Sequence, residues 1–418
     1  MGPRPKGVPM PDRFSDLPVV IVGAGPAGAG LALLLASRGV RVTLIERQRD
    51  FEREFRGEAM MPSGLEALTA MGVEVERSAL PHSRPTELEV FVERRRALRL
   101  DASSFGVRAP LLVSQSALLE HLVSLASAHA GFTFMRGAAV RDLLHENGRV
   151  AGVRVETPQG EVRLPAVLVI GADGRASSVR RRGGFEARER GTPLDIVWTK
   201  LPWPDGWGES KPARGYIGGG HLLITFPSPD GGLQLAWIIL KGSYGELKSR
   251  GIEDWVRELA NHASADLAPH LRAHADRITR PFLLSAATDR VLGWARPGAL
   301  VIGDAAHTMS PVGGQGINVA LRDAIVAANR LVPVLRAGGD GAAIDAAAAG
   351  VEAERGPEID RIQTLAAQPP RLVLARGALP RLVRSALPWL LRVPFVRAQA
   401  GRTASIFLNG VSEVKLRV

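Results

Sequence analysis

Three short apolar runs in this chain each lead directly into a glycine-rich turn. Residues 18–22 lead into Gly23, residues 168–170 lead towards the Asp173-Gly174 pair, and residues 300–302 lead into the Gly303-Asp304 pair. Short apolar runs that are rich in β-branched residues and end at glycine are typical of buried strands. Helix-like patterns follow each turn, so the chain predicts repeated strand–turn–helix units of an α/β layer.

The remaining polar and apolar periodicities predict further elements. Ser63 is the expected N-cap of a helix over residues 63–71, and Asn147-Gly148 predicts a hairpin turn. Strands are expected at residues 87–92, 97–100, 132–135, 138–145, 150–156, 162–170 and 281–286, and helices at 117–129, 251–271, 318–335 and 351–367. Residues 94–96 are expected to form a turn, and the low-complexity segment 338–350 a connection between helices.

Residues 192–245 have a different character, with strand-like runs broken by proline, tryptophan and glycine. In the run 233–240, alternation places Leu233, Leu235, Trp237 and Ile239 on one face. We expect an antiparallel sheet that forms a second lobe. Its aromatic and histidine side chains have two interpretations, core packing or the lining of a cavity, and core packing is preferred for Trp198, Tyr216, His221 and Trp237.

The first glycine turn has the pattern of a dinucleotide-binding site. Gly23, Gly25 and Gly28 form G-x-G-x-x-G between two predicted strands, and Glu46 ends the second strand 21 residues beyond Gly25. The glycines allow a tight turn and close approach of a pyrophosphate, and the acid can accept hydrogen bonds from a ribose. The pattern suits FAD and NAD equally. Arg47 raises the question of a 2′-phosphate, although a surface arginine is the preferred interpretation.

Composition removes several classes of function. With 418 residues, 45% hydrophobic and 23% charged, the chain has the size and make-up of a two-lobed globular enzyme. The absence of cysteine excludes disulfides and thiolate sites and favours the cytoplasm. The net charge of +11 comes mainly from scattered arginines without interleaved aromatics, so nucleic acid is not expected as a partner. Residues 1–17 are expected to be a disordered leader.

The three turns, in this order, resemble the group A flavoprotein monooxygenases, which have the fold of para-hydroxybenzoate hydroxylase. The glycine triplet matches the family's first motif, Asp173 and Gly174 with Ser178 and Arg180 match its second, and Gly303 and Asp304 with His307 and Pro311 match its third. The resemblance spans about residues 18–335. It implies an α/β Rossmann-like FAD-binding domain (18–85, 108–185 and 281–368) interleaved with an antiparallel substrate domain (86–107 and 186–280).

The resemblance implies FAD as cofactor, with NADPH or NADH and O2 as co-substrates. Glu46 is expected at the adenosine ribose, Asp304 near the ribityl and pyrophosphate region, and the backbone of residues 313–318 at the flavin's pyrimidine edge. Arg56 and Gln115 resemble the family's FAD-contacting arginine and glutamine. The full set of expected cofactor residues is Gly23, Gly25, Pro26, Ala27, Gly28, Glu46, Arg47, Arg56, Gln115, Asp173, Gly174, Gly303, Asp304, Pro311, Gly314, Gly316, Ile317 and Asn318.

The implied reaction inserts one oxygen atom, by hydroxylation or epoxidation, through a flavin C4a-hydroperoxide. The apolar second lobe favours a small, flat, hydrophobic substrate such as a phenol, quinone or quinolone. Weak candidates for a proton-transferring group are Tyr216, His221 and His307. Alternatives are a prenyl-chain reductase, a flavin-dependent halogenase, and a flavin-binding accessory protein without turnover. The halogenase is disfavoured because residues 235–240 contain one tryptophan rather than W-x-W-x-x-P.

The tail, residues 369–418, interleaves apolar residues with arginines and predicts amphipathic helices broken by Pro380, Pro388 and Pro394. Packing on the tail's own domain is the preferred interpretation. The alternative is peripheral contact of residues 369–400 with an anionic membrane surface. A monomer or a homodimer is expected.

Overall fold

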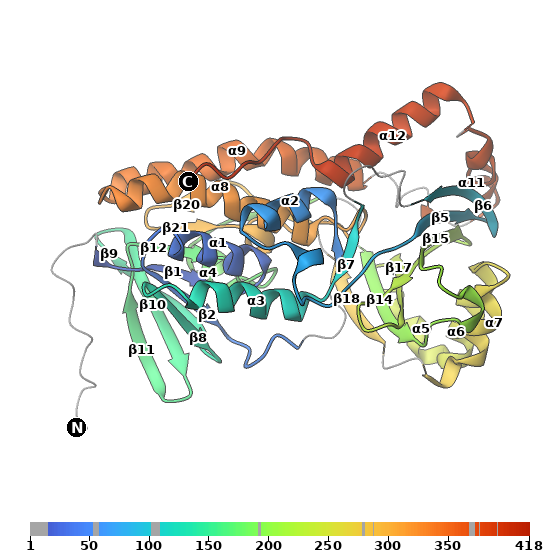
Figure 1. Ribbon diagram of the computed structural model, residues 1–418, viewed down its shortest axis with the longest axis horizontal. Coiled ribbons are helices and arrows are strands. Elements are labelled where there is room, and N and C mark those ends of the chain that lie inside the picture. Colours follow the sequence, from blue (N-terminus) through green and yellow to red (C-terminus); the bar gives the residue numbers. More distant parts are fainter. Residues whose placement is uncertain are drawn as a thin grey trace.

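The computed structural model describes residues 16–52, 58–101, 109–190, 194–277, 281–286, 288–367, 373–375, 377–390 and 392–418. Two lobes lie side by side, with the last helices of the chain running across both (Figure 1). The α/β class expected from the sequence is confirmed.

The first lobe is built on a six-stranded sheet with strand order β20-β21-β12-β1-β2-β8. All neighbours in it are parallel except the pair β20–β21. Its strands are β1 Val19–Val22, β2 Val42–Glu46, β8 Phe132–Arg136, β12 Leu168–Gly171, β20 Ala295–Arg296 and β21 Ala299–Val301. Every residue of β1 and β12 is buried, as expected for parallel strands covered on both faces.

Helices pack against this sheet and against one another. They are α1 Pro26–Ala36, α2 Pro62–Ala70, α3 Gln115–Ser127, α4 Ser178–Arg182, α8 Gly316–Arg336 and α9 Gly341–Ala367. The helix α1 packs against α8 and α3, and α8 packs against α9 (Figure 1). Because β1, β12 and β21 run parallel, their carboxyl ends lie at one edge of the sheet.

Two small sheets complete the first lobe. One contains β9 Ala139–Glu146, β10 Arg149–Thr157 and β11 Gly160–Pro165, and the other contains β3 Ala59–Met60, β4 His82–Ser83 and β7 Leu111–Val113. The β9–β10 turn uses Asn147 and Gly148 at positive φ, as the hairpin prediction requires. A further pair joins β13 Ala187–Glu189 to β19 Asp289–Val291.

The second lobe is a seven-stranded sheet with strand order β18-β14-β17-β16-β15-β5-β6. Only β15 and β5 run parallel in it. Its strands are β5 Glu87–Val92, β6 Arg95–Asp101, β14 Leu194–Leu201, β15 Pro212–Gly218, β16 His221–Pro227, β17 Leu233–Leu240 and β18 Phe282–Ala286. The helices α5 Tyr244–Arg250, α6 Ile252–His262 and α7 Leu267–Ala273 cover one face.

The two faces of this second sheet have different neighbours. Leu233, Leu235, Trp237 and Ile239 share the face that packs against α5 to α7, as the alternation predicted. The opposite face packs towards the first lobe and forms an apolar cluster that we call the interlobe layer. Its buried members are Leu112, Leu194, Ile196, Trp198, Phe226, Ala236, Ile238 and Leu374, with the partly buried Ala59 and Val312 among those packed against them.

Several local expectations were wrong. Ser63 lies inside α2, whose N-cap is Met61, because Pro62 occupies the first helical position. The β5–β6 turn is formed by Glu93 and Arg94, both at positive φ, and not by residues 94–96. The run 162–170 divides into β11 and β12, and α9 begins at Gly341, within the segment expected to be a connection. The strand at 281–286 had been assigned to the first lobe, but β18 pairs with β14 of the second.

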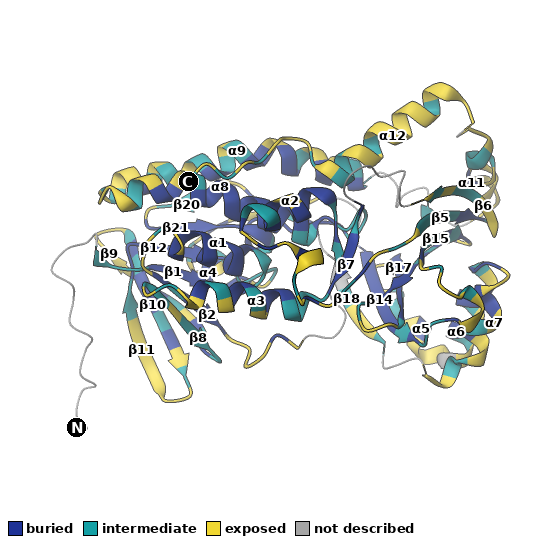
Figure 2. Ribbon diagram, in the orientation of Figure 1, coloured by how far each residue is buried: buried dark blue, intermediate teal, exposed yellow. Residues whose placement is uncertain are grey.

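The tail forms α11 Ala378–Leu390 and α12 Pro394–Asn409. Pro388 lies within α11 and does not end it, whereas Pro394 begins α12. In Figure 2, exposed residues cover much of both helices. Within the described part of the chain, no helix combines the length and apolar character needed to cross a membrane.

Candidate functional site

The turn after β1 shows why its three glycines are needed. A Cβ on Gly23, which has φ +98°, would lie 2.5 Å from the carbonyl oxygen of Ala172, and a Cβ on Gly28 would lie 1.9 Å from the carbonyl oxygen of Gly23. A Cβ on Gly25 would meet nothing within 4 Å. Gly23 and Gly28 therefore allow close packing of the turn, whereas Gly25 leaves open space beside the N-terminus of α1. That N-terminus has no acidic residue and no side-chain cap, so its N–H groups suit a diphosphate.

Glu46 ends β2 beside this turn and is only 4% exposed. One carboxylate oxygen accepts a hydrogen bond from the Ala24 N–H at 3.0 Å, and the other accepts one from the Gln48 N–H at 2.9 Å. The carboxylate is thus oriented by the glycine turn, at the place where the dinucleotide-binding pattern puts an acid for ribose hydroxyls. Arg47 is exposed, which agrees with a surface arginine. Arg56 lies outside the described residues.

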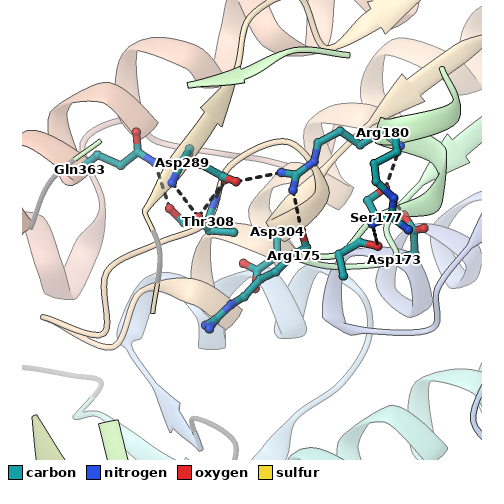
Figure 3. A network of polar contacts seen from close by, with 10 residues as sticks. Asp173, Arg175, Ser177, Arg180, Asp289, Asp304, Thr308 and Gln363 are labelled. Carbon is teal, nitrogen blue, oxygen red and sulfur yellow. Dashed lines mark hydrogen bonds and ion pairs between the residues drawn. The ribbon is translucent and has the colours of Figure 1, made fainter. Parts of the chain in front are cut away.

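Asp304 lies in the turn after β21, at the same edge of the sheet. The turn is a single 3-10 turn, Gly303–Ala305, in which Gly303 has φ +58° and a Cβ there would lie 3.0 Å from the Cβ of Ala27. Glycine thus lets this turn rest against the first turn of α1. The Asp304 carboxylate is about one-third exposed and lies 3.4 Å from the Arg175 guanidinium (Figure 3). A partly exposed acid beside the diphosphate-binding turn can accept hydrogen bonds from a polyol.

Unlike the Asp304 carboxylate, the Asp173 carboxylate forms its hydrogen bonds with neighbouring groups of the protein. It accepts hydrogen bonds from the Ser177 hydroxyl and from the N–H groups of Ser178 and Val179, and so caps α4 (Figure 3). Burial raises the pKa of Asp173, and these hydrogen bonds oppose that rise. Gly174 follows at φ +77°. Asp173 therefore shapes the second glycine turn, and Ser177 is the α4 N-cap.

A polar network joins the second and third turns (Figure 3). The Arg180 guanidinium donates to Asp289 at 3.0 Å, and Asp289 accepts hydrogen bonds from the Thr308 N–H at 3.1 Å and the Thr308 hydroxyl at 2.8 Å. Gln363 of α9 donates to the carbonyl oxygens of Asp289 and Thr308 at 2.9 and 3.0 Å. The network holds the Asp173 and Asp304 turns in a fixed relation.

The glycine-rich loop between Pro311 and α8 is held by Asn318. Its side-chain oxygen accepts from the Met61 N–H at 2.8 Å, and its side-chain nitrogen donates to the carbonyl oxygens of Ala59 and Gly314 at 3.2 and 2.8 Å. Asn318 was expected to contact the cofactor, but its amide group is used to tie β3 to the loop. The backbone N–H groups of residues 316–318 precede the first intrahelical bond, from Val319 to Gln315, and remain available to a ligand.

The loop's outer side is covered by the tail. A Cβ on Gly313 would lie 2.5 Å from the Phe407 ring, and the Gln315 side chain donates to the Phe407 carbonyl oxygen at 2.6 Å. Gly313 at φ +82° and Gly314 at φ +62° form the turn that begins at Pro311, whose carbonyl oxygen accepts from the Gly314 N–H at 3.1 Å. Helix α12 therefore supports the loop from behind.

His307 belongs to a buried ion network. Its Nε2 lies 2.7 Å from Asp323, which also accepts from the Arg355 guanidinium at 2.7 Å and from the Gly303 N–H at 3.1 Å. Arg355 also pairs with Glu358. The pKa of Asp323 is lowered, since the attraction of His307 and Arg355 outweighs the opposing effect of burial. The position of His307, 1% exposed, is that of a structural residue rather than a proton-transferring one.

Tyr216 and His221 also lie away from the glycine loops. The Tyr216 hydroxyl is 3.1 Å from the Ser264 hydroxyl, and His221 Nε2 is 2.7 Å from Glu258 of α6. Both therefore face the helices on the outer side of the second sheet. Burial raises the pKa of Tyr216 to about 12. Among the aromatic residues singled out in this sheet, Trp198 is the one in the interlobe layer.

The sequence interpretation missed Asp289, Asp323, Arg355, Glu358 and Gln363. Each is a polar residue in or beside an otherwise apolar segment, and four of them are almost fully buried. A charged residue on the buried face of a predicted helix, as at Asp323 and Arg355, is the signal that could have identified such partners. Gln115 begins α3, half-buried, with Ser114 as the N-cap.

Most of the chain matches a known protein family. The family model described as "FAD binding domain" matches residues 16–356. The chain is 33% identical over 411 residues to 6-methylpretetramide 4-monooxygenase of Streptomyces rimosus, which covers 96% of this chain and 94% of the relative. It is 28% identical to 3-demethoxyubiquinol 3-hydroxylase of Escherichia coli K12, over 73% of this chain and 77% of the relative.

Solved structures share the fold. PqsL of Pseudomonas aeruginosa superposes with a TM-score of 0.73 at 25% identity, covering 89% of this chain and 99% of that one. The p-nitrophenol 4-monooxygenase PnpA of Pseudomonas putida gives a TM-score of 0.77 at 17% identity, covering 95% and 99%.

Proposed function

Since the chain belongs to the FAD-binding-domain family of flavoprotein monooxygenases, we propose that it hydroxylates or epoxidises a flat, hydrophobic aromatic substrate held against the interlobe layer. Its relatives identify the chain as an FAD-dependent monooxygenase, and the substrate class is inferred from the structure. The position of the glycine-rich loop supports this substrate class. Val312 of that loop packs on the apolar face of the second sheet, so a flavin held by the loop would face an almost wholly apolar surface.

The residues present fit FAD. Glu46 would hold the adenosine ribose, Gly25 and the α1 N-terminus the pyrophosphate, and Asp304 the ribityl chain. The unpaired N–H groups at the start of α8 would lie against the pyrimidine edge of the flavin and stabilise negative charge there. When bound, FAD accepts a hydride from NAD(P)H and activates O2, so that one oxygen atom reaches the substrate.

The rest of the chain's contribution is orientation and exclusion of water. Asn318 fixes the loop against β3, and the tail supports it through Phe407. Trp198, Phe226, Ala236 and Ile238 offer the substrate a dry surface. A flat aromatic molecule suits such a surface better than a small carboxylate, because burying an unpaired charge there would be costly. The relative in Streptomyces rimosus, named for action on 6-methylpretetramide, agrees with this class.

The test is a screen of NADH and NADPH oxidation over phenols, quinones and quinolones, with oxygen uptake and mass detection of the product. We expect substrate-dependent oxygen uptake and a product heavier by one oxygen atom. Gly25→Val, which fills the open space beside α1, provides a variant that should fail to retain FAD. Reduction of a substrate double bond without oxygen uptake would instead indicate a reductase.

We also propose that α11 and the start of α12 contact an anionic membrane surface. Seven large apolar residues there are more than 40% exposed: Leu379, Leu382, Val383, Trp389, Leu390, Val393 and Phe395. Residues 377–409 contain five arginines and no acidic residue. Apolar side chains rimmed by arginine match a surface of acidic lipids. The same patch on a second copy of the chain would meet like charge, which disfavours a dimer through it.

Sedimentation with phosphatidylglycerol vesicles tests this surface. We expect binding that falls with salt, that is absent from phosphatidylcholine vesicles, and that is lost in Leu382→Glu/Phe395→Glu. Equal binding of the variant, or concentration-dependent dimerisation without vesicle binding, would refute it.

A further inference from the structure

In and beside the interlobe layer lie buried polar atoms without hydrogen-bond partners among the described residues. They are both amide atoms of Gln234, the indole N–H of Trp198 and one carboxylate oxygen of Glu58. Gln234 is 1% exposed and Trp198 is 6% exposed. A buried polar atom that is left unpaired destabilises the fold, so several of them at one apolar layer need an explanation.

Strand register places Gln234 on the face that looks towards the first lobe. Its neighbours Leu233 and Leu235 belong to the cluster that packs on α5 to α7, so Gln234 points the other way. Its partners across the sheet are Lys200 on β14 and Phe226 on β16. Trp198 lies two residues before Lys200 and therefore on the same face as Gln234.

Glu58 approaches this face from the first lobe. It directly precedes Ala59, which belongs to the interlobe layer and whose carbonyl oxygen binds Asn318 at 3.2 Å. A Cβ on Gly314 would lie 3.5 Å from the Cβ of Ala59. Glu58 is therefore next in the chain to a residue that contacts the glycine-rich loop, and its carboxyl group is close enough to Lys200 of the second sheet to interact with it.

Within the described part of the chain, the charged groups that act on Glu58 are Lys200 and Asp230. Burial raises its pKa to about 7, Lys200 opposes that rise, and Asp230 adds to it. Lys200 and Asp230 are paired with each other at 2.6 Å, so neither neutralises Glu58 by itself. The carboxyl group thus changes between a donor and an acceptor near neutral pH.

We propose that Glu58, Gln234 and Trp198 form the polar recognition site for a hydroxyl group on the aromatic substrate and for a carbonyl group beside it. The carboxylate of Glu58 accepts a hydrogen bond from the hydroxyl, and the Gln234 and Trp198 N–H groups donate to the carbonyl. This assignment rests on the proposed function and narrows its substrate class to hydroxylated flat aromatics. A hydrogen bond to a carboxylate also increases electron density on the ring, which favours electrophilic oxygenation.

The test uses 2-naphthol as probe and 2-methoxynaphthalene as matched control, because the methoxy compound keeps the ring and the oxygen but cannot donate. Binding to the FAD-loaded protein is followed by the change in the flavin absorption spectrum, from pH 5.5 to about pH 8.5, across the range in which Glu58 ionises. The variants are Glu58→Gln, which preserves shape, and Glu156→Gln, whose exposed pair with Arg141 is remote in the β9–β10 sheet. FAD content and melting temperature verify that each variant is folded.

We expect 2-naphthol to bind the wild type and Glu156→Gln about tenfold more tightly above pH 7 than below it, and 2-methoxynaphthalene to show no such step. In Glu58→Gln, the affinity for 2-naphthol should no longer rise above pH 7, and the affinity for 2-methoxynaphthalene should be unchanged. A step that persists in Glu58→Gln overturns the assignment. So does equal binding of both compounds at every pH, while the proposed substrate class stands. Failure of the wild type to bind either compound overturns the proposed substrate class, and the Glu58 site with it.

Discussion

Asp323 offers the sharpest test of how the third glycine turn is held. It is fully buried and accepts hydrogen bonds from His307, Arg355 and the Gly303 backbone. The substitution Asp323→Asn keeps the shape but removes the negative charge, and leaves the 0% exposed Arg355 with Glu358 as its remaining carboxylate. Breaking a buried ion pair on one side costs about 3–5 kcal/mol. Because Arg355 retains Glu358, we expect about 3 kcal/mol.

Thermal unfolding followed by circular dichroism measures this loss. Large domains shift by about 2 °C per kcal/mol, so the melting temperature should fall by about 6 °C. FAD should also dissociate more readily, because an amide has one acceptor oxygen for the three donors, His307, Arg355 and the Gly303 N–H, that the two carboxylate oxygens of Asp323 serve. The exposed pair Arg141–Glu156 serves as control, and Glu156→Gln should change stability by less than about 1 kcal/mol.

The sign of the pH dependence gives a second check. The pKa of Asp323 is lowered in the folded state, so its ionised form stabilises the fold above the unfolded pKa of about 3.9. The stabilisation disappears as the pH falls through the lower folded value. The difference between wild type and Asp323→Asn should therefore be constant from about pH 6 to pH 9 and shrink below about pH 4. A melting temperature within about 1 °C of wild type at pH 7 would refute the reasoning.

Three further results are expected. Gly28→Val should abolish FAD retention, seen as loss of the flavin spectrum, because any Cβ there overlaps the Gly23 carbonyl at 1.9 Å; full FAD content would contradict this. Glu58→Gln should be more stable than wild type at pH 8 but not at pH 4. Burial raises the pKa of Glu58 to about 7, so at pH 8 folding must either protonate the carboxyl group or bury its charge, and at pH 4 it need do neither. The gain in the free energy of unfolding, measured with urea at pH 8, is at most about 3 kcal/mol. Phe407→Ala should weaken FAD binding by about tenfold through the loop at Gly313, measured by flavin release, and unchanged release would show that the tail does not support the loop.

The sequence predicted those features whose causes are local. The glycine turns, the β1 and β12 strands and the Asn147 hairpin depend on residues close in the chain, and the motif order indicated the family. The pairing of β18 with β14 depends on a partner almost ninety residues away, so it carried no local signal. Alternation separated the two faces of β17 but could not tell which face of the sheet meets the first lobe. His221 was therefore a candidate from sequence and is directed towards α6 in the structure.

The buried network could not be predicted for a related reason. Asp323 and Arg355 are 32 residues apart, on two helices whose rotation about their axes is set only by packing. Alanine-rich segments also carry little periodicity, which is why the start of α9 was placed ten residues too late. The burial of Glu58 carries no local signal either, because residues far away in the chain surround it.

The tail has a mechanical consequence. Arg384 of α11 is 2% exposed and binds Glu93 at the β5–β6 turn, while Phe407 at the other end of α12 covers Gly313. One continuous segment is thus fastened to both lobes, on either side of the layer where they meet (Figure 1). Separation of the lobes must stretch or detach this segment. Exchange of a large ligand between the lobes is therefore coupled to the position of the glycine-rich loop. Lengthening the link between α11 and α12 by a few glycines would uncouple them without altering a single residue of the site.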